Sequence, residues 1–414
     1  MFFLMVAGLA LLAQVYVWRR MVWDTTRPGR ARWIGTAVLV GMFLLMLAAL
    51  LGAREMRPET ARWFAWPGYL WIAVLIYSTL ALVVLELPRL VLSRRLALRG
   101  RVQRHREPAR ELAEPSGAAA GPEPAESVPA PEEPVDRGRR LVLARGTALA
   151  AGVAALGVVG YGASSALGQP NVKRVPVRLD RLPADFSGFR IAVVSDIHLG
   201  PLAGAAHTER IVRTINEQQP DLVAIVGDLV DGSPEHLGDA ARPLRDLDAP
   251  EGSFFVTGNH EYYAGFEGWR AELERLEVFS LLNDHTTISR GAGRFTLAGV
   301  NDVAGEDIDE GPDFDRALAG TSADNARILL AHQPVLIDDA VRHGVDLQLS
   351  GHTHGGQMWP GSLLVGLQQP SVAGLSKVDD TMLYVTRGAG FWGPPVRVGA
   401  PPDVSIVELG AGLR

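Results

Sequence analysis

The sequence predicts an α/β domain preceded by about four transmembrane helices. From about Asn171 onward, short apolar runs alternate with polar segments of helical character, which is the pattern of an α/β domain. Before that residue, four stretches are apolar over about 18 residues or more, the length that crosses a bilayer. The 414 residues, 47% of them hydrophobic, suffice for one sizeable globular domain and a membrane region.

Residues 1–92 are expected to form three transmembrane helices, and residues 141–168 a fourth transmembrane helix or signal-anchor. The first three apolar stretches are Met1–Trp18, Ile34–Gly52 and Pro67–Leu92. Glu86 and Pro88 lie near the end of the third stretch, where a charge can reach the membrane interface. Region 93–140 is rich in Arg, Pro and Glu and has few large apolar residues, so we expect a disordered cytoplasmic linker there.

The placement of arginine predicts the topology of these helices. Arginines crowd the loop after the first helix and the segment after the third, so both are expected to face the cytoplasm. In the loop between the second and third helices, Glu55 and Glu59 dilute the arginines, and this loop is expected outside. The sequence therefore predicts an integral membrane protein whose domain 171–414 lies on the extracytoplasmic side.

Two features of the fourth apolar stretch leave its processing open. Arg139 and Arg140 precede it in a pattern similar to a twin-arginine export signal, and an ordinary positive flank explains them equally well. The small residues from Ala163 to Ala166 could form a signal-peptidase site. In that case the last domain would be released rather than tethered.

The distribution of charge argues against nucleic acid as a partner. Residues 1–170 hold 20 of the 40 basic and 12 of the 46 acidic side chains, which leaves a formal charge of +8 on this part and −14 on the rest. A domain so acidic is a poor candidate for nucleic-acid binding, because phosphate contacts need clustered Lys and Arg. The chain has no cysteine, so a metal site can use only nitrogen and oxygen ligands.

Five apolar runs of the domain each end in residues that can bind metal. Since open α/β sheets place their sites at the carboxyl ends of strands, we expect these residues to converge. Glycines precede several of them and permit tight turns and a close approach of the backbone. Five of the ten histidines take part. The motifs are Asp196-x-His198, Gly227-Asp228-x-x-Asp231, Gly258-Asn259-His260-Glu261, His332 and Gly351-His352-x-His354.

The number and spacing of these residues favour two metal ions. In Asp196-x-His198 and His352-x-His354, side chains two residues apart lean to the same side and can share one ion or two neighbouring ions. Seven of the motif residues are candidate nitrogen or oxygen ligands, which is more than one metal ion binds. They suit two ions about 3.5 to 4 Å apart with a shared carboxylate, an arrangement that serves in-line displacement at phosphorus.

These motifs, in this order, resemble the calcineurin-like metallophosphoesterases, over a region from about Phe189 to the C-terminus. The resemblance implies a four-layer α-β-β-α metallophosphoesterase sandwich and a metal-dependent phosphoric ester hydrolase. The segments 352–357 and 390–395 are similar to the membrane-associated or exported phosphodiesterase branch of the family. The helical N-terminal region is a departure about which the motifs say nothing.

The resemblance also implies a role for each residue of the site. Three residues would hold the first ion, three would hold the second, and Asp228 would bridge the two. His260 would stabilise the transition state or protonate the leaving oxygen. Imidazole ligands suit manganese, iron or zinc better than calcium or magnesium. The first set is Asp196, His198 and His354, and the second is Asn259, His332 and His352.

The function expected from this site is hydrolysis of phosphodiester or pyrophosphate bonds by a metal-activated hydroxide. A lipid or a lipid-linked nucleotide is a candidate substrate, because the membrane helices would hold the enzyme near such molecules. Two alternatives stay open: a catalytically inert metal-binding sensor or scaffold at the membrane, and a phosphomonoesterase. Aromatic residues near the motifs could line an apolar wall or simply pack the loops. They are Tyr262, Tyr263, Trp269, Trp359, Phe391 and Trp392.

Four further residues receive structural interpretations. Asp231 is expected to brace its turn or to orient a ligand. Asp302 is expected in a turn. For Arg387 and Arg397, surface salt bridges are expected rather than contacts with substrate phosphate.

Overall fold

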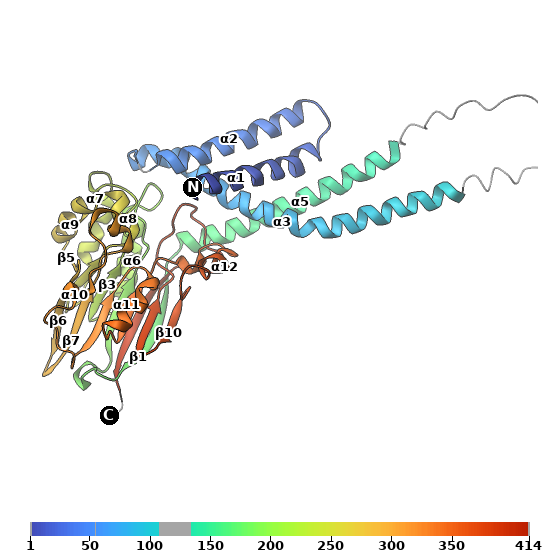
Figure 1. Ribbon diagram of the computed structural model, residues 1–414. Coiled ribbons are helices and arrows are strands. Elements are labelled where there is room, and N and C mark those ends of the chain that lie inside the picture. The colour runs from blue at the N-terminus through green and yellow to red at the C-terminus, as the bar shows by residue number, and fades with distance from the viewer. Residues whose placement is uncertain (1, 54, 107–133, 413–414) are drawn as a thin grey trace, which may run out of the picture. The chain divides into compact units, whose positions relative to one another are not determined.

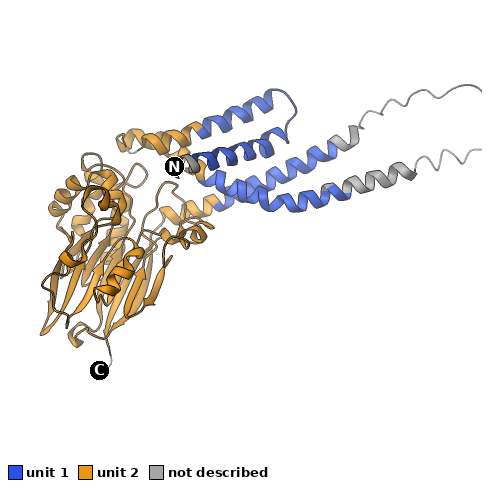
Figure 2. Cartoon of the chain, in the orientation of Figure 1, with its two compact units in different colours: residues 1–43, 73–158 blue, residues 44–72, 159–414 orange. Residues whose placement is uncertain are grey.

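The structure is a computed structural model that describes residues 2–53, 55–106 and 134–412. It divides into two compact units (Figure 2). Unit 1 comprises Met1–Phe43 and Ala73–Val158, and unit 2 comprises Leu44–Ile72 and Val159–Arg414. The expected globular domain therefore lies in unit 2, together with short parts of the N-terminal helices.

The N-terminal region is helical, as expected. Its helices are α1 (Phe2–Trp18), continued by the π-helical turn η1 (Arg19–Trp23), α2 (Arg30–Gly52), α3 (Pro58–Arg106) and α5 (Pro134–Leu167). Among the described helices, three are long and apolar enough to cross a membrane, over Arg30–Gly52, Pro58–Leu92 and Gly138–Leu167. Helix α1, with 17 residues, is not one of these three.

Helices extend into both ends of region 93–140, where we expected a disordered linker. Helix α3 continues to Arg106 and α5 begins at Pro134. Residues 93–106 consist largely of Arg and Leu, which are good helix formers and can prolong a helix beyond its apolar part. The remainder of the expected linker, 107–133, lies outside the described residues.

The charge near the end of the third apolar stretch is compensated within unit 1. Glu86 Oε2 lies 2.5 Å from Arg20 Nη2, and Arg89 also contacts Glu86. Arg20 Nη1 in turn lies 2.7 Å from Asp24 Oδ2. A paired charge has a smaller free-energy cost near an apolar phase than an isolated charge, so Glu86 is compatible with a membrane helix.

Unit 2 contains two six-stranded sheets. The first has the order β1-β12-β2-β3-β4-β5, and the second has the order β10-β11-β9-β8-β7-β6. In the first sheet β2 to β5 are parallel and β12 is antiparallel to β2. The strands of the first sheet are β1 (Asn171–Leu179), β2 (Phe189–Val194), β3 (Leu222–Val226), β4 (Ser253–Val256), β5 (Val278–Ser280) and β12 (Asp403–Ala411). Those of the second are β6 (Asp284–Arg290), β7 (Gly293–Gly299), β8 (Ala326–Leu330), β9 (Leu347–Ser350), β10 (Gly374–Val378) and β11 (Thr381–Val385).

Alternating side chains of the strands build three buried layers. Along β2, Ile191 and Val193 join the core between the two sheets, whereas Ala192 and Val194 join the core under the helices of the first sheet. This is the period of two that a strand buried on both faces requires. A third core packs helices on the outer face of the second sheet.

The result is a four-layer α-β-β-α sandwich, as the sequence predicted (Figure 1). The helices α6 (Ala205–Asn216), α7 (Pro234–Ala241) and α9 (Phe266–Arg275) cover the first sheet, and α10 (Phe314–Ala317) and α11 (Ile337–Arg342) cover the second. The short helix α8 (Asn259–Ala264) begins at a predicted ligand, and the short helix α12 (Gly361–Val365) comes after the last one, His354. This arrangement brings the carboxyl ends of β2, β3 and β4 toward those of β8 and β9.

Candidate metal centre

The predicted ligands all follow the carboxyl end of a strand. Asp196 and His198 follow β2, Asp228 follows β3, and Asn259 and His260 follow β4 in the first sheet. In the second sheet His332 follows β8, and His352 and His354 follow β9. Asn259 and His352 are half-buried and the other six are buried. Both sheets therefore contribute to one buried cluster of nitrogen and oxygen atoms.

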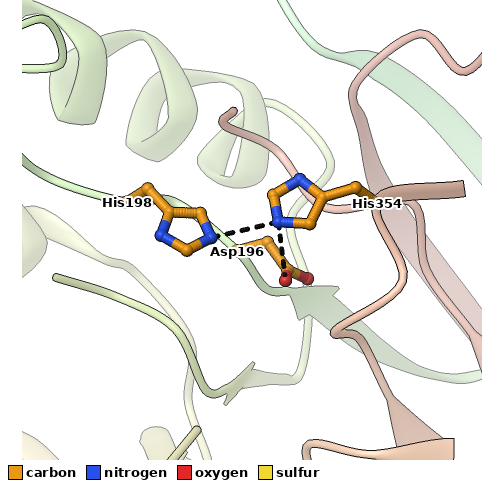
Figure 3. Close-up of side chains that lie close together, drawn as sticks. All are labelled: Asp196, His198 and His354. Carbon is orange, nitrogen blue, oxygen red and sulfur yellow. Dashed lines mark hydrogen bonds and ion pairs between the residues drawn. The ribbon is translucent and has the colours of Figure 1, made fainter. Parts of the chain in front are cut away.

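The first group of side chains consists of Asp196, His198 and His354 (Figure 3). His198 Nε2 lies 3.0 Å from His354 Nε2, which lies 3.2 Å from Asp196 Oδ1. Two donors that share one tetrahedral ion at about 2.1 Å lie about 3.4 Å apart. The spacing of these three atoms is therefore close to that of ligands around a single ion.

The second group consists of Asp228, His332 and His352. His332 Nε2 lies 3.2 Å from Asp228 Oδ2 and 3.3 Å from His352 Nδ1. The predicted third ligand of this ion, Asn259, places its Oδ1 in a buried position where no described residue donates a hydrogen bond to it. Such an orphaned acceptor is costly unless a ligand satisfies it.

The carboxylate of Asp228 faces both groups. Its Oδ2 lies 3.2 Å from His332 Nε2 of the second group and 3.7 Å from His198 Nε2 of the first. Its Oδ1 accepts a hydrogen bond of 2.9 Å from the His260 main-chain N–H. This fixed position, with one oxygen directed at two imidazoles from different sheets, is the position that the bridging role of Asp228 requires.

Hydrogen bonds outside the cluster select the nitrogen that each imidazole presents. His332 Nδ1 lies 2.7 Å from the carbonyl oxygen of Val226, so Nδ1 carries the proton and donates it. His198 Nδ1 lies 3.2 Å from Asp231 Oδ1 and donates to that carboxylate. In the neutral form of both residues Nε2 then faces the cluster with its lone pair, as metal binding requires.

His260 lies beside the cluster and pairs with Asp231. Its Nδ1 lies 2.5 Å from Asp231 Oδ1, and its Nε2 lies 4.0 Å from Asp228 Oδ2. The rings of Tyr263 and Trp392 approach His260 edge-on at centroid distances of 5.7 and 5.8 Å. Asp231 therefore orients His198 and His260 together, which agrees with the orienting role that we considered for it.

The backbone at the site is held in an uncommon conformation. Eleven non-glycine residues in the described part of the chain have a positive φ, and five of them are predicted ligands: Asp196, His198, Asp228, His352 and His354. Each such residue costs about 1 to 3 kcal/mol and persists only where its surroundings enforce it. This concentration of strain at the strand ends is typical of a functional site.

Two glycines allow this close packing of the loops. A Cβ atom on Gly258 would collide with the Asp228 carboxylate, and one on Gly351 would collide with the Ser195 hydroxyl. Both glycines directly precede predicted ligands. Their lack of a side chain, rather than an unusual φ, is what the site needs from them.

The electrostatics of the site suit cation binding. Burial, with Arg397 nearby, lowers the pKa of His354 well below its usual value, and burial lowers the pKa of His352 to about 3. Burial alone would raise the pKa of the Asp228 carboxyl, but His332 and the other imidazoles hold it well below its usual range. Neutral imidazoles and an ionised carboxylate are the forms that bind metal. His332 differs from His352 and His354, because despite burial Asp228 raises its pKa well above the usual value, so His332 must lose a proton when a metal binds.

Asp196 gives a further test of whether a cation fits. Burial raises the pKa of its carboxyl group. No residue among those described donates a hydrogen bond to its Oδ1, although His354 Nε2 is 3.2 Å away. A buried carboxylate in this state is stabilised by a neighbouring positive charge. The donor set, its spacing and its orphaned acceptors all fit divalent ions.

Three residues of the site were missed or misread in the sequence. Buried Glu261 accepts hydrogen bonds from the main-chain N–H groups of Asp228 (3.0 Å) and Gly258 (2.6 Å), and so joins two ligand loops. Asp302 is buried and also accepts a hydrogen bond from Gln333, beyond the turn role expected of it. The surface salt bridge expected for Arg397 was wrong.

Arg397 is 1% exposed and donates to main-chain carbonyls instead of pairing at the surface. Its Nη1 lies 2.6 Å from the His354 carbonyl and its Nη2 lies 2.6 Å from the Gly390 carbonyl. The guanidinium thereby ties a ligand loop to the segment that follows β11. No local pattern in the sequence distinguishes this buried arginine from exposed ones.

Comparison with known proteins agrees with this site. The profile of the calcineurin-like phosphoesterase family matches residues 189–356, which include all the predicted ligands. The chain is 39% identical over 259 residues to a Danio rerio transmembrane protein with a metallophosphoesterase domain, across 60% of this chain and 59% of that protein. The matched part thus spans less than two thirds of that relative.

Two bacterial relatives are covered more fully. An uncharacterized metallophosphoesterase of Helicobacter pylori strain 26695 is 39% identical over 260 residues, across 62% of this chain and 68% of that protein. One from Aquifex aeolicus is 32% identical over 242 residues, across 58% of this chain and 91% of that protein. Together with the fold and the site geometry, these matches show that the chain belongs to the calcineurin-like metallophosphoesterase family.

Proposed function

We propose that this chain is a membrane-anchored phosphoesterase that uses two divalent ions to hydrolyse phosphodiester or pyrophosphate bonds. The observation that carries the proposal is the position of Asp228, whose Oδ2 faces His198 of one donor group and His332 of the other. Manganese, iron and zinc fit the imidazole-rich donor set best. The family relationship supports the same class of reaction.

The ligands and His260 would have different roles in such a reaction. When bound, the two ions would supply a nucleophile at neutral pH and offset the charge on the phosphoryl oxygens. With Asp196 and Asp228 as the carboxylates and neutral ligands elsewhere, the loaded site keeps a net positive charge and attracts an anionic ester. His260, oriented through Asp231, would place its Nε2 beside the reacting phosphorus and donate a proton to the leaving oxygen.

The contacts within unit 2 support an extracytoplasmic catalytic domain. Leu202, four residues after His198, packs against Ala53, Ala61 and Ala65 from the ends of α2 and α3. This packing supports a position of the domain on the same side of the membrane as the short loop that joins these two helices. In this loop acidic residues partly offset the charge of the arginines, which predicts an outside location. A reporter fused after residue 414 and active only in the cytoplasm would overturn the assignment.

The substrate class that we propose is an amphiphilic phosphoester, either a phospholipid or a lipid-linked nucleotide. The membrane helices of the chain support this class, because they confine the site to the surface where such molecules lie. The acidic balance of the domain argues against long nucleic acids. A soluble phosphomonoester is the competing substrate to test.

The experiment uses the purified full chain in lipid nanodiscs, loaded with manganese and supplied with an aryl phosphodiester, an aryl phosphomonoester and a nucleoside diphosphate lipid. We expect preferential hydrolysis of the diester or the pyrophosphate, and a loss of at least about 100-fold in kcat for Asp228→Asn. The matched control is Asp380→Asn in the exposed turn between β10 and β11.

The outcomes separate the competing functions. Preference for the monoester would replace the diesterase by a phosphomonoesterase. Bound metal at two ions per chain without hydrolysis of any of the three substrates would favour an inert metal-binding scaffold. Equal activity of Asp228→Asn and Asp380→Asn would remove the basis of the proposal.

A further inference from the structure

The segment that follows the last predicted ligand exposes large apolar side chains. We name residues 359–367, which include helix α12, the apolar loop. Trp359 is 57% exposed, and the three leucines of the loop are 67%, 69% and 82% exposed at Leu363, Leu364 and Leu367. A cluster of such exposed apolar side chains is typical of a surface that meets a membrane or another apolar partner.

The sequence around the apolar loop is free of charge. No Asp, Glu, Lys or Arg occurs between Asp346 and Lys377, although 21% of the residues in the chain are charged. An exposed loop in water gains solubility from charged side chains, and this one has none. The loop can therefore enter an apolar phase without the cost of removing a charge from water.

Contacts within unit 2 connect the apolar loop to the end of helix α5. The main-chain N–H of Arg397 donates to the carbonyl of Gly162 in α5 at 2.9 Å. One residue further, the carbonyl of Val398 accepts a hydrogen bond of 2.9 Å from the N–H of Trp359, and Val398 also forms a β-bridge with Met358. One short segment thus joins the last turns of a candidate membrane span to the start of the apolar loop.

A second contact places the ends of α2 and α3 near the same site loops. Besides the packing of Leu202 on these helices, a Cβ atom on Gly393 would lie 3.8 Å from the ring of Tyr69 in α3. Trp392, next to Gly393, also contacts His260. The ends of three candidate membrane spans therefore meet the loops that surround the metal centre and lead into the apolar loop.

We propose that the apolar loop inserts into the bilayer that holds α2, α3 and α5. Its leucines would enter the boundary between headgroups and acyl chains, about 5 to 10 Å deep, and the Trp359 ring would lie at the interface. The occupant of this surface is thus a phospholipid bilayer rather than a second protein. The inference concerns membrane contact and stands without the proposed hydrolysis.

Membrane insertion would also determine which substrates reach the site. This inference about the substrate rests on the proposed function. His352 and His354 precede the apolar loop directly, so insertion would hold the metal centre against the headgroups. A phosphoester in the headgroup of a lipid could then reach the site without leaving the bilayer. The substrate class would be the lipids of the leaflet that receives the loop.

The chain offers a clean test because it contains no cysteine. A single cysteine introduced by Leu364→Cys is labelled with an environment-sensitive fluorophore in the full chain, reconstituted in vesicles of phosphatidylethanolamine and phosphatidylglycerol. The matched control is Ala292→Cys, in the exposed turn between β6 and β7 at the opposite edge of the second sheet. Leu367→Cys serves as a second position within the loop.

We expect lipids brominated along the acyl chain to quench the label at position 364 at least about twofold more than the label at 292, given the insertion depth of such loops. Aqueous iodide should show the reverse order. Equal quenching by iodide at both positions would place the loop in water and overturn the proposal. Protection from iodide without quenching by brominated lipid would indicate a protein partner or a second copy, and would also overturn it.

The measurement needs neither substrate nor metal. A chain that quenches as expected but hydrolyses nothing would retain the membrane contact and lose the proposed function. A chain that hydrolyses lipid phosphoesters with its loop in water would retain the proposed function and lose the membrane contact. The two proposals therefore fail separately.

Discussion

The side chains of His198 and His354 face each other across the metal centre with their Nε2 atoms 3.0 Å apart. Because His198 Nδ1 donates to Asp231, the Nε2 atom of a neutral His198 carries a lone pair. His354 also presents Nε2, and no described residue binds its Nδ1. A cation between the two rings would satisfy both lone pairs.

Loading with metal should stabilise the folded domain. A metal at about 100 times its Kd adds about 2.7 kcal/mol to the free energy of unfolding. We expect manganese to raise the Tm of the full chain in nanodiscs, and a chelator to reverse the increase. His354→Ala should lose most of the metal-dependent increase, while Ala292→Ser should retain it. An equal increase in both variants would show that the metal binds elsewhere.

Asp231→Asn should lower activity more than metal content. Both imidazoles donate to the same oxygen of Asp231, and the neutral amide oxygen accepts these hydrogen bonds more weakly than the carboxylate does, so His260 should be held less firmly. Loss of such an orienting partner typically costs about 10- to 100-fold in activity or metal affinity. We expect a fall in kcat with near-normal metal by elemental analysis, and a changed pH profile. A variant with full kcat would limit Asp231 to a role in its own turn.

Protonation of His352 and His354 should destabilise the metal-free domain as the pH falls below about 6.5, whereas the raised pKa values of Glu261 and His332 contribute in the opposite direction. Burial lowers the pKa of His352 to about 3 and that of His354 well below its usual value, so the folded state binds fewer protons than the unfolded state. Stability from these groups is full above the unfolded pKa and is lost toward acid, by up to about 1.4 kcal/mol per pH unit for each imidazole. Thermal unfolding with chelator between pH 5 and pH 8 measures the slope, which His352→Asn should reduce.

Phe295 should contribute strongly to the core between the sheets. Its ring contacts Phe186 and Phe189 edge-on at centroid distances of 4.8 and 5.6 Å, and all three rings are fully buried. Phe295→Ala should lower the free energy of unfolding by about 3 to 5 kcal/mol, and Phe295→Leu by less. Chemical unfolding monitored by near-UV circular dichroism compares the two variants. Equal small losses would mean that the core collapses around the missing ring.

The sequence predicted the part of the site that local patterns encode. Apolar runs such as Ile191–Val194 mark strands, and the polar residues that follow them mark strand ends, so the convergence of residues such as Asp228 and His332 could be expected. The strand order could not, because pairing over long distances in the chain leaves no local pattern. The burial of Arg397 depends on the carbonyls of His354 and Gly390, which only the folded chain brings to it.

The extents of the helices were also harder to predict than their presence. The apolar pattern of the third stretch ends near Leu92, but hydrogen bonding within the α3 backbone continues to Arg106. Helix propagation needs only good helix formers, not apolar ones, once a turn exists. The positive φ angles of Asp196 and His354 likewise follow from the loops that surround them and not from their own residue types.

The position of β12 determines when the first sheet can be completed. Strand β12 lies between β1 and β2, and no described strand comes later in the chain, so β2 lacks this antiparallel neighbour until residue 411 has been synthesised. If the domain is exported unfolded, residues up to 411 must also have crossed the translocation channel before the first sheet closes. The complete metal centre would then form in the compartment that receives the domain.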